Sequence, residues 1–174
     1  CVLDAGSPSG VFPLTCTRPL ALCPVANRPL IEAQRQSLAE AGLEDLVPGA
    51  DGADGAGEPR LWLSGAAWLS RSQLCHLARC ETAVVVRDSQ GLALAWTGCR
   101  PEPAPDATVL AAPADSFAIR YPWDLLRVNE ILVGALVEDR IEGLVRAGVV
   151  VDGHITLGEG SVLLPGVYIE GNAV

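Results

Sequence analysis

The sequence contains no lysine, and all 12 of its basic side chains are arginines. This absence excludes Schiff-base catalysis, attachment of pyridoxal phosphate and a Walker-type phosphate loop, because each requires an ε-amino group that arginine cannot supply. It also excludes any nucleotidyl transfer that depends on a lysine.

Long hydrophobic runs and an excess of positive charge are absent as well. No apolar run reaches the roughly 18 residues that cross a bilayer, so we expect no membrane partner. The net charge of -9 argues against nucleic acid, because binding to phosphate backbones requires clustered basic residues. A hydrophobic share of 49% with 19% charged residues is typical of a globular protein.

The six cysteines contain no CxxC pair and no zinc-like spacing. We expect no signal peptide, and a chain of this size does not require disulfides to fold. We therefore expect reduced thiols, a cytoplasmic location and no metal site.

The first part of the chain has the pattern of an α/β unit. Residues 2–5 predict a short buried strand, and a Gly/Ser/Pro turn follows at 6–10. After a proline-rich loop, Pro29 is suited to the first helical position, and apolar spacing indicates a helix that ends near Gly42. The Gly/Ala/Asp stretch 49–57 predicts a flexible connection.

Shorter elements follow. The pattern predicts a strand at 61–63, a short helix at 73–80, a hairpin of 82–86 with 92–96, and a Pro/Ala-rich loop at 100–113. A further helix begins near Asp124, which we expect to be its N-cap. Four tryptophans lie in apolar segments and are expected mainly in the core: Trp62, Trp68, Trp96 and Trp123.

The last thirty residues repeat with a period of six. Cut from position 145, they form five hexads that each begin with an aliphatic residue, and the fifth place of each is small or β-branched. The hexads begin at Val145, Val151, Leu157, Leu163 and Ile169. This period predicts a parallel β-helix, and the closest description is a left-handed hexapeptide β-helix with three hexads per coil. Five hexads make fewer than two coils, so we expect the solenoid to be incomplete within these residues.

Two segments resemble a known family. VLDAGSPSGVFPLTCTRPLALCPVANRPLI is similar to the start of sugar-1-phosphate nucleotidylyltransferases, whose pattern runs LAAGxGTRLxPLTxxxPKxLxPVxNxPLI. YPWDLLRVNEILV resembles the stretch that joins this domain to a left-handed β-helix in bifunctional nucleotidylyltransferase/acyltransferase proteins. Together with the hexads, the matches cover about half of the chain in the expected order.

The resemblance implies a nucleotide loop, a lysine and two metal-binding carboxylates. The loop would correspond to Gly6, Ser7, Ser9 and Gly10, where Pro8 replaces a glycine and removes one N–H donor. Four charged family positions are occupied by other residues: Gly10 in place of an arginine, Leu20 in place of the lysine, and Ala66 and Ala118 in place of the two metal-binding aspartates. Without these charges little remains to hold Mg²⁺ or a triphosphate.

The two histidines are candidates for catalytic groups. A coil histidine is the general base of acyltransferases of this type, but His154 lies in an early coil, where a solvent-facing or edge position is expected. His76 follows Cys75 directly, and adjacent helical residues point in different directions, so a Cys/His nucleophile is not expected.

We therefore expect an α/β chain with a shortened, degenerate, Rossmann-type nucleotidyltransferase-like domain at 1–143 and the first left-handed β-helix coils at 144–174. We expect no catalytic residue, no cofactor except Mg-nucleotide if activity survives, and at most weak binding of a nucleotide or sugar phosphate. The expected role is structural, oligomerising or regulatory, in a homo-oligomer that is a trimer if the solenoid continues. Two alternatives remain open: the N-terminal part of a sugar or sugar-nucleotide acyltransferase with its site in later coils, and a nucleotidylyltransferase with an altered site.

Overall fold

The computed structural model describes residues 2–4, 9–43, 47–48, 60–99 and 102–174. The expected flexible connection at 49–57 and the loop residues Gly6, Ser7 and Pro8 lie outside the described residues. Contacts within the chain divide it into two compact units, Cys1–Leu125 and Leu126–Val174. This division falls before the domain boundary of 143/144 that the sequence suggests, within a single helix, and the two units are described separately below.

The first unit is built on a six-stranded mixed sheet in the order β4-β1-β5-β8-β7-β9. Strand β1 pairs in parallel with β4 and β5, β8 pairs antiparallel with β5 and β7, and β9 pairs in parallel with β7. The fold is therefore mixed α/β. The strands are β1 (Val2–Asp4), β4 (Val47–Pro48), β5 (Arg60–Ser64), β7 (Val84–Arg87), β8 (Ala93–Gly98) and β9 (Thr108–Ala111).

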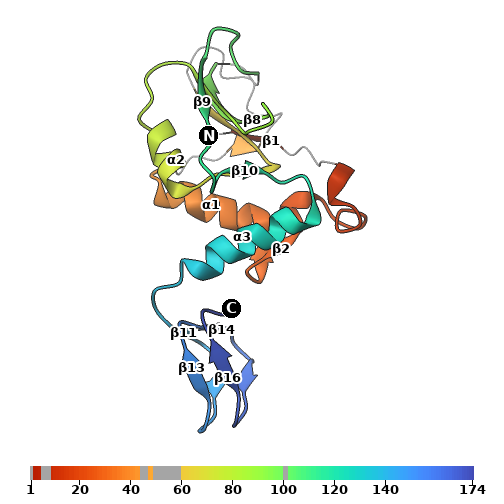
Figure 1. Ribbon diagram of the computed structural model, residues 1–174, viewed down its shortest axis with the longest axis vertical. Coiled ribbons are helices and arrows are strands. Elements are labelled where there is room, and N and C mark those ends of the chain that lie inside the picture. The colour runs from red at the N-terminus through yellow and green to blue at the C-terminus, as the bar shows by residue number, and fades with distance from the viewer. Residues whose placement is uncertain (1, 5–8, 44–46, 49–59, 100–101) are drawn as a thin grey trace. The chain divides into compact units, whose positions relative to one another are not determined.

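Helices α1 (Leu30–Glu40) and α2 (Arg71–Leu77) cover one face of this sheet (Figure 1). Their buried leucines pack with alternate residues of the strands, because successive strand residues point to opposite faces. The core on this side includes Leu38, Leu74 and Leu77 of the helices. On the opposite face, Trp62 and Trp96 lie across β5 and β8 as a stacked pair beside Val85.

Several small elements surround the sheet. Two short 3-10 helices, η1 (Ser9–Val11) and η2 (Leu20–Leu22), precede a hairpin of β2 (Pro24–Val25) and β3 (Arg28–Pro29). The hairpin turn holds Ala26 and Asn27 at φ +45° and +60°, a left-handed conformation that alanine adopts at a cost. A second antiparallel pair joins β6 (Ala67–Trp68) to β10 (Phe117–Ala118).

Five sequence predictions require correction. Pro29 is the N-cap rather than the first helical residue, and the short helix spans Arg71–Leu77 rather than 73–80. The loop expected at 100–113 contains β9, which forms because it pairs with β7 although its surroundings are rich in proline. Trp123 is 62% exposed, so only the other three tryptophans belong to the core.

The fifth correction concerns Asp124, which the sequence pattern predicts to be an N-cap. Helix α3 (Pro122–Gly134) begins two residues before it. Asp124 is therefore in the first turn rather than at the N-cap. Its Oδ2 atom accepts hydrogen bonds from the backbone N–H groups of Arg120 and Tyr121, at 2.8 Å each. This back-contact satisfies donors at the helix start in the manner of a capping box.

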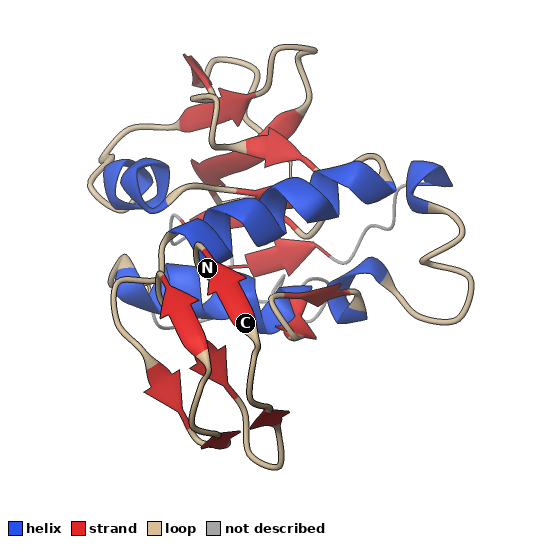
Figure 2. Cartoon of the chain, turned by 60° about the horizontal axis from the view of Figure 1, so that its bottom comes forward, coloured by secondary structure: helices blue, strands red, loops and turns tan. Residues whose placement is uncertain are grey.

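The second unit contains a coil that returns on itself. Its short strands pair in parallel, and residues eighteen positions apart lie side by side, Leu144 with Val162 and Val150 with Tyr168. The first turn is two residues shorter, since Ile141 pairs with Leu157. These pairs are drawn as short red arrows in Figure 2. The strands are β11 (Arg140–Ile141), β12 (Leu144–Val145), β13 (Val150–Asp152), β14 (Thr156–Leu157), β15 (Val162–Leu163) and β16 (Tyr168–Glu170).

The hexad positions behave as the period of six predicts. Val145 lies beside Leu163 and Val151 beside Ile169, so residues of the same phase stack on one another three hexads apart. Gly153, at φ +143°, allows the two turns to approach, because a Cβ atom there would lie 2.3 Å from the carbonyl oxygen of Gly171. Among the described residues, no helix is long and apolar enough to cross a membrane.

Candidate functional site

Gly10, which aligns with an arginine in the family that the sequence resembles, lies in η1 against the segment before α3. A Cβ atom on Gly10 would lie 2.3 Å from the carbonyl oxygen of Arg120 and 3.4 Å from the ring of Tyr121. Real Cβ atoms do not approach an oxygen so closely, so no side chain fits without backbone movement. The space into which an arginine would extend is filled by main chain.

Leu20, at the position of the family lysine, is the first residue of η2 and is only 2% exposed. The preceding residue, Pro19, orders this turn through its carbonyl, which accepts the N–H of Leu22 at 3.0 Å. A side chain that contacts a phosphate must reach solvent or a cleft, whereas this one is enclosed. Position 20 therefore contributes to the core in this chain.

Ala66 and Ala118, far apart in the sequence, lie next to each other in the fold. Ala118 pairs directly with Ala67 between β10 and β6, and the N–H of Ile119 donates to the carbonyl of Ala66 at 2.7 Å. Ala66 thus lies in the turn just before β6, and its backbone is next to the β10 segment that contains Ala118. Among the residues that the structure describes, no group of three or more His, Cys, Asp or Glu side chains could hold a metal ion. These residues do not fit the divalent cation that the family implies.

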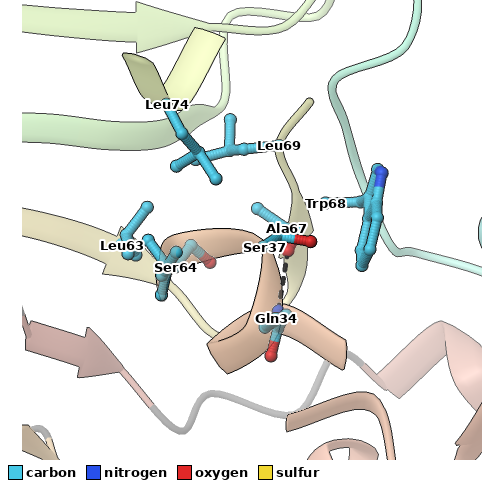
Figure 3. A pocket seen from close by; sticks show the side chains of 9 residues that line it. Gln34, Ser37, Leu63, Ser64, Ala67, Trp68, Leu69 and Leu74 are labelled. Atoms are coloured by element: carbon cyan, nitrogen blue, oxygen red, sulfur yellow. Dashed lines mark hydrogen bonds between the residues drawn. The ribbon is translucent and has the colours of Figure 1, made fainter. Parts of the chain in front are cut away.

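Gln34 of α1 fixes the turn that carries Ala66. Its buried amide nitrogen donates to the carbonyls of Gly65 at 3.3 Å and Ala67 at 2.8 Å, the shorter of which is dashed in Figure 3. The cavity beside this contact has a volume of about 20 Å³. A single water requires at least about 10–15 Å³ by the same measure, so the cavity has room for about one water and is far too small for a nucleotide.

Arg120 and Asp88 form an ion pair that sequence patterns could not reveal. The Nη2 atom of Arg120 lies 2.5 Å from Oδ2 of Asp88, whose side chain is 8% exposed. The other oxygen of Asp88 accepts the backbone N–H groups of Gln90 and Leu92, at 2.9 Å each, within the hairpin turn. The pair therefore connects the β7–β8 hairpin to the segment that closes over Gly10.

A larger hollow of about 420 Å³ lies elsewhere in the first unit and includes none of the four positions. Its lining is mainly apolar, with Arg60 and Glu81 as charged groups and two thiols, Cys80 and Cys99. Nothing in the spacing of these cysteines indicates that they share a cavity. No motif of the sequence points to a ligand for it.

Among the cysteines that the structure describes, Cys23 is the most deeply buried. It is fully buried behind η2, and burial raises its pKa above the usual value of 9.0, while the charge of Arg18 opposes this shift. A raised pKa keeps the sulfur protonated and unreactive at neutral pH. Cys23 is therefore a core residue and not a candidate nucleophile.

The comparisons with known proteins assign no family. No family model matches the chain, and no curated protein matches its sequence. The candidate site is therefore defined by its own geometry, in which Gly10 lies against backbone, Leu20 is buried in the core, and Ala66 and Ala118 carry methyl groups. Gly6 and Ser7 lie outside the described residues, and Ser9 is described only as the start of η1.

His154 lies at the edge of the second unit. Its side chain is 43% exposed, and its Nδ1 atom is 3.5 Å from Oδ1 of Asp139. Asn172 accepts the backbone N–H of His154 and donates to the carbonyls of Val133 and Leu136. The surroundings of His154 thus tie the coil to the end of α3, and its surface position agrees with the expectation for an edge histidine.

Proposed function

We propose that the chain is a nucleotidyltransferase-like domain without nucleotidyl-transfer activity, joined to left-handed β-helix coils, and that it serves as an oligomerising scaffold. The main support for the proposal is that Ala66 and Ala118 lie on neighbouring backbone segments and that neither offers a metal ligand. A two-carboxylate metal site needs acidic side chains on neighbouring elements, and both positions carry methyl groups instead. The neighbouring segments support the family resemblance, and the methyl groups support inactivity.

Two further contacts support inactivity independently. Restoring an arginine at position 10 would require the Arg120 carbonyl to move, and restoring a lysine at position 20 would bury an ammonium group in the core. Position 10 is therefore closed by a backbone carbonyl and position 20 by core packing, so neither has room for a cationic side chain. A site that has lost its cations cannot offset the charge of a triphosphate, which costs several kcal/mol in the transition state.

The scaffold role is supported by the surface of the coil. Six large apolar side chains of its strands and turns are 45–61% exposed, namely Ile141, Leu144, Val150, Val162, Leu164 and Tyr168. Contiguous exposed apolar residues mark interaction surfaces in soluble proteins. Most soluble oligomers are symmetric assemblies of identical chains, so we expect these exposed side chains to meet in a symmetric homo-oligomer.

The proposal is tested by restoring both carboxylates. The variant Ala66→Asp/Ala118→Asp places two carboxylates on neighbouring backbone segments. We expect Mn²⁺ to raise the melting temperature of the double variant but not of the wild type or either single variant. At a concentration 100 times the Kd, the cation stabilises the folded state by about 2.7 kcal/mol. If Mn²⁺ has the same effect on single and double variants, positions 66 and 118 do not form a metal-site pair.

The altered-site alternative is tested by pyrophosphate release from the wild-type protein. With UTP, dTTP or GTP and several sugar 1-phosphates, we expect no release above a protein-free blank. Release that depends on both the sugar phosphate and Mg²⁺ would establish a functioning transferase and overturn the proposal.

A further inference from the structure

Two side faces of the coil carry outward apolar pairs stacked in register. Alternation along the strands turns Val151 and Leu163 inward and the residues on either side outward, as their exposure shows. One face is formed by β12 and β15, where Leu144 lies beside Val162. The other is formed by β13 and β16, where Val150 lies beside Tyr168.

The charges on these two faces are opposite and equivalent in position. Two residues after Leu144 comes Arg146, and two residues after Val150 comes Asp152, which lies directly beside Glu170. We call the first the basic face and the second the acidic face. The basic face consists of Leu144, Arg146, Val162 and Leu164, and the acidic face of Val150, Asp152, Tyr168 and Glu170.

Neither set of charges is neutralised within the chain. Among the described residues, Arg146, Asp152 and Glu170 take part in no ion pair. Like charges directly opposite each other destabilise a pair of strands, so the Asp152–Glu170 neighbourhood costs free energy unless a cation approaches. On β11, by contrast, Arg140 already has a partner in Glu142, with Nη2 and Oε1 2.7 Å apart.

We infer that the partner of this surface is a second copy of the chain, whose acidic face docks on the basic face. Leu144 and Val162 then contact Val150 and Tyr168 of the second copy, and Arg146 lies between the two carboxylates. The contact is heterologous, since each copy offers one face of each kind. The inference rests on the proposed oligomerising role and adds to it the two faces, their polarity and the residues that set the pairing.

The test is a charge exchange measured by sedimentation of the full chain over a range of concentrations at low salt. Arg146→Glu places three acidic groups together, and Asp152→Arg/Glu170→Arg places three basic groups together. Each variant should weaken self-association at least about tenfold, because like charges meet at the contact. The triple variant, which combines both changes, should restore it. The matched control is Arg140→Glu, the same reversal on β11, which should leave self-association unchanged.

The outcomes separate this inference from the function on which it rests. If the wild type associates but the exchanges affect it no more than Arg140→Glu does, the paired faces are wrong while the scaffold role stands. If the wild type remains monomeric up to millimolar concentration, both the scaffold role and the inference fail. Circular dichroism and melting curves of every variant confirm that a loss of association does not result from unfolding.

Discussion

Replacing Leu20 by the lysine that the family carries should unfold the protein more readily rather than revive a site. Leu20 is 2% exposed, so the change removes the burial of a leucine, worth about 1.5–3 kcal/mol, and forces an ammonium group into the core. We expect a total loss of about 3–5 kcal/mol, since lysine escapes part of the cost by extending toward solvent or losing its proton. The total free energy of unfolding of a domain of this kind is about 5–15 kcal/mol.

Urea denaturation followed by tryptophan fluorescence measures the loss. With a slope of about 2 kcal/mol/M, the midpoint should fall by roughly 2 M. Leu22→Lys is the matched control, because it lies in the same 3-10 turn but is 50% exposed, and it should change stability by less than about 0.5 kcal/mol. Equal effects of the two variants, together with a gain of nucleotide affinity at position 20, would refute the argument that this position is part of the core.

Three further predictions follow from local geometry. Gly10→Ala should cost about 1–3 kcal/mol through its clash with a carbonyl oxygen, whereas Gly98→Ala, which meets no atom within 4 Å, should be nearly neutral in the same urea assay. Ala26→Gly should stabilise the protein by up to about 1 kcal/mol, because Ala26 has a φ of +45° that glycine adopts without strain. The control Ala39→Gly in α1 should destabilise the protein. If both variants lower the free energy of unfolding, Ala26 is not strained. Burial raises the pKa of Cys23, so as the pH rises the thiol ionises in the unfolded state before it does in the folded state. The free energy of unfolding should therefore decline above about pH 9. The variant Cys23→Ala should show a smaller decline, and an equal decline in that variant would exclude this cause.

The sequence predicted elements with strong local patterns and missed those that depend on pairing. The β7–β8 hairpin and α1 follow from alternation, turn residues and helical spacing, and the period of six anticipated that Val151 would stack on Ile169. Strand β9 escaped prediction, because a proline-rich segment forms a strand only when β7 supplies a partner. The exposure of Trp123 could not be read from its neighbours either, since its contact with Tyr121 depends on how α3 begins.

The sequence could indicate which positions belong to the candidate site, but not how the residues at those positions are packed. The resemblance to the family pattern singled out Gly10, Leu20, Ala66 and Ala118 and named the residue types that the family has at those positions. It could not show that the Arg120 carbonyl fills the space at Gly10 or that Leu20 is enclosed, because both depend on long-range packing. The Arg120–Asp88 pair and the thiols of the larger hollow also join segments with no recognisable spacing.

The central claim is that the domain does not bind metal–nucleotide as an active nucleotidyltransferase does. Isothermal titration calorimetry of the wild-type chain with UTP, dTTP and GTP, each with and without Mg²⁺, tests this claim most directly. We expect no binding tighter than about 1 mM, equivalent to a binding free energy of about 4 kcal/mol. Micromolar binding that requires Mg²⁺ would contradict it.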